Sequence, residues 1–373
     1  MSIRVVPHCE ELREAVESFN SRMRAGGSPW GFYVDPEPNW IPKRPGQNVW
    51  REYHVAVDEQ QAVHGGFTLK PQDWRIRGET KIVTDWQGPV SEGGVNPEHA
   101  SLAIRLVREM ISKRPALFSW GHGGNDQPLV QMLGKMSWLM HETPFCLLVL
   151  KPTRFLRLNA YLRTSAIRRA ALNLLAYCGA GFVGIRLLHA LLRLKARRRF
   201  GATALEVTEF GSWADDLWER CKDRYAAIAV RDSASMNVLA PVGGWPKVIR
   251  LKVERSGNAI GWALVMDTRM HGDARFGGLR VGSIVDCLAD PADAGDVVSA
   301  ATAFLRRREV DIIVSNQAHP GWICGFAENG YLVLPRRRLF VASPELQRML
   351  EPFADTARGL HLTNMDGHGP HLL

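Results

Sequence analysis

The sequence of 373 residues lacks the short motifs that mark several enzyme classes. It has no Gly-Lys-Ser/Thr phosphate-binding motif, no His-Glu-x-x-His zinc motif and no recognisable Ser-His-Asp arrangement. Each of these motifs places particular groups around a phosphate, a metal or a nucleophile. Nucleoside triphosphatase, metallopeptidase and serine hydrolase activities therefore have no support in the sequence.

Cysteine is sparse and scattered. No two of the six cysteines form a Cys-x-x-Cys pair, and none lies in a cluster with histidine at the spacing of metal ligands: Cys9, Cys146, Cys178, Cys221, Cys287 and Cys324. This spacing argues against a structural zinc site and against a disulfide framework. With no apparent secretory signal, we expect free thiols, no metal and a cytoplasmic protein.

Acidic residues are missing from one segment. Residues 151–200 contain twelve Lys or Arg and no Asp or Glu, whereas the rest of the chain has 35 basic and 38 acidic residues. The net charge of +9 therefore comes from this segment alone. A nucleic-acid-binding surface over the whole protein is not implied.

Within this segment, residues 170–185 are nearly all apolar, but sixteen residues are fewer than the roughly 20 that a membrane-spanning helix needs. Arginines flank the run on both sides. One interpretation is a helical hairpin or an interfacial helix on an anionic membrane surface, which would make the protein peripheral to the inner membrane. The other is a buried helix that connects the two halves of the chain.

The remaining sequence shows an internal repeat. Residues 53–58 and 63–69 alternate or run apolar around a polar turn, and residues 249–254 and 260–265 do the same. Such a pattern predicts a β-hairpin. In both halves a strand, a helix, a second strand, a short helix and a last strand are expected to follow, in the same order. We therefore predict domains at 1–150 and 201–373, with a basic, apolar helical connector at 151–200.

This order resembles that of the GNAT superfamily of acyltransferases, whose core runs hairpin, central strand, helix, strand, helix and strand. The tandem arrangement is similar to Fem-type and exopolysaccharide-associated GNAT proteins. The resemblance implies an α/β fold with two tandem GNAT-like domains, each a mixed sheet flanked by helices. It also implies an acyl-CoA donor.

GNAT enzymes bind the pyrophosphate of coenzyme A at a glycine-rich turn after the central strand, where backbone N–H groups meet the phosphates. The corresponding turn of the first half is Ser-Glu-Gly-Gly at 91–94, so Gly93 and Gly94 are candidate cofactor-binding residues. In the second half, Asp290 and Asp293 would repel a pyrophosphate. The first half is therefore the better candidate for the donor site.

Acyl transfer to an amine needs a general base, and four residues are candidates for catalysis. Glu92 lies in the donor turn, while Asp85 and Asp286 lie on or beside the central strands in apolar surroundings. His122 follows the strand at 116–120. The alternative role of Asp85 and Asp286 is a hydrogen-bonded structural carboxylate, and that of His122 is a solvated loop residue.

The resemblance also implies further donor-binding residues and the loss of a tyrosine that many GNAT enzymes use. The candidate residues for binding the donor are Gly123, Gly124, Asn125 and, in the second half, Asn316. The tyrosine that protonates the leaving thiolate in many GNAT enzymes is replaced by Leu133 in the first half and by Phe326 in the second. Residues 361–368, polar and glycine-bearing, are expected to form an exposed tail, although Asp366 and His368 have the reach to enter a groove.

We therefore expect an N-acyltransferase that moves an acyl group from acyl-CoA or an acyl carrier to an amine. An amino sugar or a cell-envelope or exopolysaccharide precursor is the hypothetical acceptor. One alternative is a Fem-type transferase that uses aminoacyl-tRNA, in which case the basic connector would bind RNA. The other is a non-catalytic GNAT-like scaffold.

Overall fold

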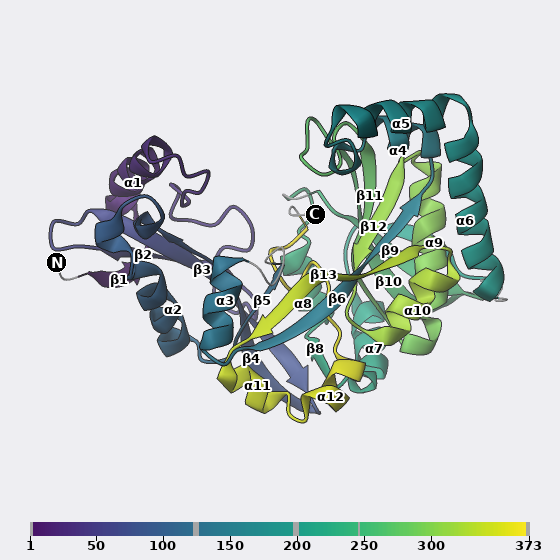
Figure 1. Ribbon diagram of the computed structural model, residues 1–373. Coiled ribbons are helices and arrows are strands. Elements are labelled where there is room, and N and C mark those ends of the chain that lie inside the picture. Colours follow the sequence, from purple (N-terminus) through teal and green to yellow (C-terminus); the bar gives the residue numbers. More distant parts are fainter. Residues whose placement is uncertain (1–2, 122–126, 197–200, 245–246, 371–373) are drawn as a thin grey trace. The chain divides into compact units, whose positions relative to one another are not determined.

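The computed structural model describes residues 3–121, 127–196, 201–244 and 247–370. The chain forms two compact units (Figure 1). Unit 1 consists of Met1–His141 and Phe340–Glu351, and unit 2 consists of Glu142–Leu339 and Pro352–Leu373. The basic segment 151–200 thus lies inside unit 2.

Unit 1 is built on strands in the order β1-β2-β3-β4-β5. They are antiparallel except for the parallel pair β4–β5: β1 (Arg4–Pro7), β2 (Glu52–Val57), β3 (Val63–Ile76), β4 (Glu79–Ser91) and β5 (Leu117–Gly121). The helices are α1 (Arg13–Ala25), α2 (Leu102–Lys113), α3 (Pro128–Lys135) and α11 (Pro344–Met349). Short 3₁₀ turns follow β4 at η2 (Glu92–Gly94) and η3 (Pro97–His99).

Hydrophobic periodicity explains these elements. In α1, Val16, Phe19 and Met23 recur at helical spacing and pack against the alternate residues Val55 and Val57 of β2. Burial of these apolar faces stabilises the helix against the sheet.

Unit 2 has the strand order β6-β12-β11-β10-β9-β7. The strands of this path and two others are β6 (Leu139–Val149), β7 (Thr203–Val207), β8 (Ala227–Ala229), β9 (Ile249–Arg255), β10 (Asn258–Arg269), β11 (Arg280–Ala289), β12 (Ile312–Asn316) and β13 (Leu332–Ala342). The helices are α4 (Pro152–Leu158), α5 (Ala166–Tyr177), α6 (Ala180–Ala196), α7 (Ser212–Cys221), α8 (Ser233–Leu239), α9 (Ala294–Arg307), α10 (Pro320–Glu328) and α12 (Phe353–Thr356). The runs β2-β3-β4-α2-β5-α3-β6 and β9-β10-β11-α9-β12-α10-β13 have the same order of elements, as expected.

Each unit takes a strand from the other half of the sequence. Residues 145–149 of β6 pair with β12 in unit 2. In unit 1, the N–H of Ser343, just after β13, donates to the carbonyl of Leu117 on β5 over 2.9 Å. The compact units are therefore bounded at residues 142, 340 and 352 rather than at the residues 150 and 200 that the repeat predicts.

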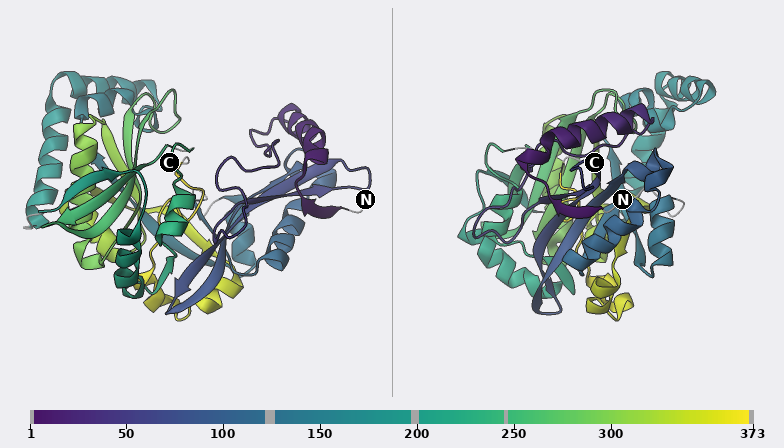
Figure 2. Two further views of the ribbon diagram at one scale, coloured as in Figure 1. Left: turned by 180° about the vertical axis from the view of Figure 1, so that it is seen from behind. Right: turned by 90° about the vertical axis from the view of Figure 1, so that its left-hand side faces the viewer.

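The apolar run at 170–185 forms parts of two helices. Gly179, whose φ is +78°, separates α5 from α6, and the two helices are bent by 78° (Figure 2). Among the described residues, no single helix is long and apolar enough to cross a membrane, whereas this bent pair passes that test by length and composition. Most side chains of the pair are exposed, so the expectation of a buried connecting helix is wrong.

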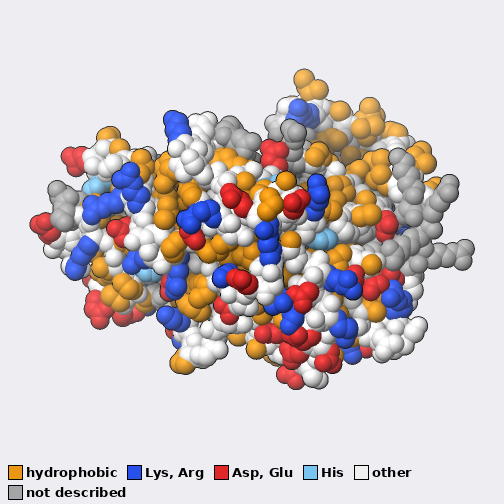
Figure 3. Space-filling model, turned by 90° about the horizontal axis from the view of Figure 1, so that it is seen from below, with side chains coloured by type: hydrophobic (Ala, Val, Ile, Leu, Met, Phe, Trp, Pro, Cys, Tyr) orange, Lys and Arg blue, Asp and Glu red, His pale blue; other side chains and the backbone are white. Residues whose placement is uncertain are grey.

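Outside this segment the charges are mixed. On the face shown in Figure 3, acidic and basic side chains are interspersed. This mixing agrees with the charge count of the sequence.

Candidate active site

Glu92 lies buried at the turn that follows β4 in unit 1, only 5% exposed. Its carboxylate accepts hydrogen bonds from Nε and Nη2 of Arg22 on α1, at 2.8 and 3.0 Å. This bidentate contact is the strongest geometry for an ion pair between an arginine and a carboxylate. It ties the turn to the first helix.

His64 on β3 continues the network. Its Nδ1 lies 2.8 Å from Oε2 of Glu92, and its Nε2 lies 3.0 Å from Oδ2 of Asp58. Both ring nitrogens donate only when the imidazole carries both protons. The four side chains form one chain of alternating groups, Asp58–His64–Glu92–Arg22, in which the first three are buried and Arg22 is half-buried.

The hydrogen-bond partners of Glu92 and Asp58 shift the pKa values of these two acids. Burial raises the pKa of Glu92, but hydrogen bonds from Arg22 and His64 outweigh it and leave the pKa below its ordinary value. The hydrogen bond from His64 likewise lowers the pKa of Asp58. A carboxylate stabilised in this way is a weak general base. The arrangement suits positioning of the turn better than proton abstraction.

Two of these groups, together with His99, have the composition of a metal site. One ligand atom each of His64, Glu92 and His99 lies within 4.8 Å of the others, and the two imidazole rings are 4.3 Å apart. Asp58, which lies beside the other ring nitrogen of His64, would orient the imidazole toward a metal ion. The Arg22 guanidinium occupies both oxygens of Glu92, however, and its charge opposes a cation there.

The two glycines of the turn differ in their surroundings. A Cβ on Gly93 would lie 2.3 Å from the carbonyl oxygen of His99, whereas nothing lies within 4 Å of one on Gly94. The N–H groups of Gly93, Val95 and Asn96 bond within the turn, to Ser91 Oγ and to the Glu92 carbonyl. Packing against the next turn thus explains the glycine at 93.

Strands β4 and β5 part soon after they meet. They pair only at Thr84 with Leu117 and at Asp85 with Phe118. Asp85 is 1% exposed and lies opposite Lys70, itself 1% exposed, in the register of β3 and β4. Asp85 therefore stands where the strands begin to separate. The candidates His122, Gly123, Gly124 and Asn125 lie outside the described residues.

In unit 2, Asp286 on β11 is completely buried in an ionic cluster. Its Oδ2 lies 3.0 Å from Nε of Arg231, and Nη2 of Arg231 lies 2.7 Å from Oδ1 of Asp366. Burial raises the pKa of Asp286 to about 6 against the opposing charge of Arg231, and the Asp366 carboxylate adds to the rise. All three side chains are 0% exposed, so Asp286 is completely enclosed by its partners.

The expectation of an exposed C-terminal tail is wrong, because residues 360–366 are buried where β11 and β12 part. Thr363 Oγ1 donates to Asp286 over 2.9 Å, and His361 Nε2 lies 2.9 Å from the carbonyl of Cys287. The N–H of Ala318, just past β12, donates to the Leu362 carbonyl. The chain's own residues thus occupy this parting of the strands.

Asn316, a predicted donor-binding residue, belongs to the same cluster. It is 2% exposed, and its Nδ2 donates to Oδ1 of Asn364 over 3.3 Å. Its Oδ1 has no hydrogen-bond partner within the described part of the chain. Leu133 and Phe326, which replace the expected tyrosines, are completely buried.

The sequence analysis missed Arg22, Asp58, His64 and Arg231. Arg22 and His64 are 70 and 28 residues from Glu92, and Arg231 is 55 residues from Asp286, so no local spacing marks them. Asp58 is only six residues from His64, but no motif marks that pair. A buried charge needs a partner, so the apolar surroundings of Asp286 did signal that a cation must be near.

No family model and no curated protein sequence matches the chain. Solved structures do match. A structure of Saccharomyces cerevisiae N-myristoyltransferase with bound myristoyl-CoA aligns with a TM-score of 0.52 and 10% identity, over 91% of this chain and 78% of that chain. A second structure of that enzyme with myristoyl-CoA gives a TM-score of 0.50 and 9% identity, over 91% of this chain and 82% of that chain. A GCN5-related N-acetyltransferase from Anabaena variabilis gives a TM-score of 0.49 and 10% identity, over 91% of this chain and 72% of that chain.

The chain therefore has the fold of an N-myristoyltransferase. The predicted fold class, two α/β units with mixed sheets flanked by helices, is confirmed. At 10% identity the likeness shows the fold alone.

Proposed function

We propose that the protein is an N-acyltransferase that moves an acyl group from a thioester donor to an amine. The observation that carries the proposal is the parting of β4 and β5 after Asp85 and Phe118, in a fold whose solved relative holds myristoyl-CoA. In such a reaction the amine nitrogen forms a bond to the acyl carbon, the carbon–sulfur bond breaks, and the thiolate leaves with a proton.

We assign the donor to unit 1. In unit 2, residues 360–366 fill the corresponding parting of β11 and β12 with hydrogen-bonded chain. A donor would have to displace these bonds and expose the buried Asp286–Arg231 pair, at a large free-energy cost.

The proposed residue roles follow from burial. Asp85 and His122 are the candidate bases, because Asp85 stands at the parting of the strands and His122 follows β5 in sequence. Glu92, held by Arg22 and His64, positions the donor turn. The acceptor is an amine, with an amino sugar or a glycan precursor as the specific hypothesis.

The test is binding of acyl-CoA of increasing chain length, measured as a shift in thermal unfolding. A ligand at a hundred times its Kd stabilises the fold by about 2.7 kcal/mol. The variant Gly94→Glu adds a negative charge to the open position of the unit 1 turn. We expect it to weaken donor binding by about tenfold or more.

The matched control is Ala292→Glu, the same charge change in the corresponding turn of unit 2. It leaves donor affinity unchanged if the donor binds unit 1. A loss with Ala292→Glu but not with Gly94→Glu would move the donor to unit 2. No shift with any acyl-CoA would contradict the proposed donor.

One observation favours a second candidate, a non-catalytic binding protein of the same fold. Three N–H groups of the unit 1 turn already bond within it, which leaves fewer for a pyrophosphate. Amide formation from a bound acyl-CoA separates the two candidates.

A further inference from the structure

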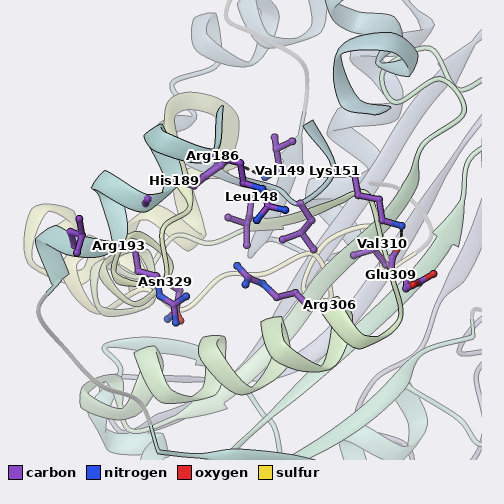
Figure 4. A pocket seen from close by; sticks show the side chains of 13 residues that line it. Leu148, Val149, Lys151, Arg186, His189, Arg193, Arg306, Glu309, Val310 and Asn329 are labelled. Atoms are coloured by element: carbon purple, nitrogen blue, oxygen red, sulfur yellow. Dashed lines mark hydrogen bonds between the residues drawn. The ribbon is translucent and has the colours of Figure 1, made fainter. Parts of the chain in front are cut away.

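Unit 2 contains an open cavity of about 870 Å³ between α6, the end of β6 and the C-terminal end of α9. Figure 4 shows Arg186 and Arg193 on α6 and Arg306 on α9 around the same hollow. Apolar residues complete the lining: Leu148, Val149, Leu150, Ala190, Leu194 and Val310. The cavity thus combines cationic groups with an apolar wall.

None of the three arginines forms a salt bridge with another residue that the structure describes, and the one acid in the cavity lining is Glu309. Burial and the positive charges of Arg193 and Arg186 lower the pKa of Arg306. The other charged lining residues are Lys151, which lies 3.8 Å from Asp311, and Glu309, whose carbonyl accepts a bond from Lys151.

One buried side chain of α6 forms hydrogen bonds to the rest of unit 2 on both sides of its ring. His189 is buried, its Nδ1 lies 2.8 Å from the carbonyl of Gly330, and its Nε2 accepts the N–H of Val149 over 3.2 Å. Both ring nitrogens of His189 therefore hold α6 in place, and with it the wall of the cavity.

The outward side of the same helix pair is apolar. Seventeen large hydrophobic side chains are exposed in the described residues, and ten of them lie on α5 and α6. On α6, Val183, Leu187, Leu191 and Leu194 recur at helical spacing with exposed fractions between 50% and 72%. Surface hydrophobic residues gathered in this way mark an interaction site.

We propose that α5 and α6 dock on an anionic lipid bilayer, with the phosphate of a lipid headgroup in the cavity between Arg186, Arg193 and Arg306. The apolar stripe enters the interface between headgroups and acyl chains, as amphipathic surface helices do. The absence of acidic residues from 151–200 removes repulsion from a negative membrane surface. The proposal is independent of acyl transfer, because docking requires no catalysis.

A bilayer fits this surface better than RNA does. Phosphate contacts to RNA need the arginines but not the exposed Val183, Leu187 and Leu191, which would stay in water. A bilayer covers the charged and the apolar groups together.

The test is flotation of the whole protein with vesicles of phosphatidylcholine, with and without phosphatidylglycerol. We expect binding to the anionic vesicles and little to the neutral ones. Arg186→Gln with Arg193→Gln weakens binding roughly thirtyfold at low salt. Leu187→Ser with Leu191→Ser weakens it by about tenfold or more, and this loss persists at high salt because apolar contacts are not screened.

Two controls separate the cavity from diffuse charge. Ile104→Ser with Arg108→Gln alters exposed residues of α2 and leaves binding unchanged. Arg306→Gln removes a cavity arginine, whereas Arg307→Gln removes its neighbour on α9, which does not line the cavity. We expect only Arg306→Gln to weaken binding.

Equal losses with Arg306→Gln and Arg307→Gln would overturn the headgroup site. No binding to anionic vesicles by the wild-type protein would overturn docking altogether. Saturable binding of tRNA that the arginine variants abolish, without vesicle binding, would assign the surface to RNA. Binding of inorganic phosphate without vesicle binding would assign the cavity to a soluble anion.

Discussion

Nδ1 of His64 lies 2.8 Å from Oε2 of Glu92, which joins the start of β3 to the turn after β4. Arg22 reaches the same carboxylate from α1. Three elements of unit 1 therefore meet at one buried acid in the turn at 91–94.

The first prediction concerns the charge of Glu92. Glu92→Gln is expected to lower the free energy of unfolding by about 1–3 kcal/mol at neutral pH, since charged hydrogen bonds to Arg22 and His64 are weakened. The folded pKa of Glu92 lies below its ordinary value of 4.5, so the carboxylate stabilises the fold above that pH. The deficit should disappear as pH falls through the folded pKa. Urea unfolding across this pH range measures it.

Glu98→Gln is the matched control, because Glu98 is an exposed acid in the adjacent turn η3. It should leave stability within about 0.5 kcal/mol of wild type. A pH-independent deficit for Glu92→Gln would show that its charge is not what stabilises the turn.

The second prediction concerns metal binding at His64, Glu92 and His99. Arg22 occupies the carboxylate oxygens that a cation would need. Zinc should therefore raise the unfolding temperature of Arg22→Ala more than that of the wild-type protein. The double variant Arg22→Ala/His99→Ala should lose the gain. An equal zinc response in the wild-type protein would mean that Arg22 does not block the site.

The third prediction compares the two glycines of the turn. Gly93→Ala is expected to cost about 1–3 kcal/mol, because the added Cβ meets the backbone carbonyl of His99, which has little room to move. Gly94→Ala should change stability by less than about 0.5 kcal/mol, since nothing lies near its Cβ. Thermal unfolding of the pair is the measurement, and similar costs for both would contradict the packing argument.

The sequence predicted the order of elements well because each depends on local periodicity. The alternation in β2 and the helical spacing of Val16, Phe19 and Met23 identify their elements without knowledge of the fold. Local periodicity does not determine which sheet a strand joins. Nothing in residues 145–149 indicates that β6 pairs with β12, because apolar strands fit either sheet.

The candidate site was predicted less fully. Glu92 and Asp286 were recognised as unusual carboxylates, but their partners Arg22 and Arg231 are more than fifty residues away in sequence. Residues 361–368 were expected to form an exposed tail because they are polar and include a glycine. They are buried because Thr363 and Asp366 complete the hydrogen bonds and charges of Asp286 and Arg231. A polar segment is expected to be exposed only when the interior offers it no hydrogen-bonding partners.

The last prediction concerns Arg231, whose guanidinium separates two buried carboxylates. Arg231→Met leaves Asp286 and Asp366 together without a cation, and we expect a loss of about 3–5 kcal/mol at neutral pH. Without Arg231 both acids should have folded pKa values above the ordinary 3.8, and each then binds its proton more tightly in the folded state. The variant should therefore be more stable at acid pH and lose stability as pH rises through those values.

Arg250→Met is the matched control. Arg250 is also buried, but it donates to the carbonyl of Ala240 rather than to a carboxylate. Its substitution should reduce the free energy of unfolding with little dependence on pH. The free energy of unfolding of Arg231→Met could instead depend as little on pH as that of this control. The two carboxylates are then not held ionised by Arg231. Residues 360–366 would have to be retained in unit 2 by their other hydrogen bonds, those of His361 and Leu362.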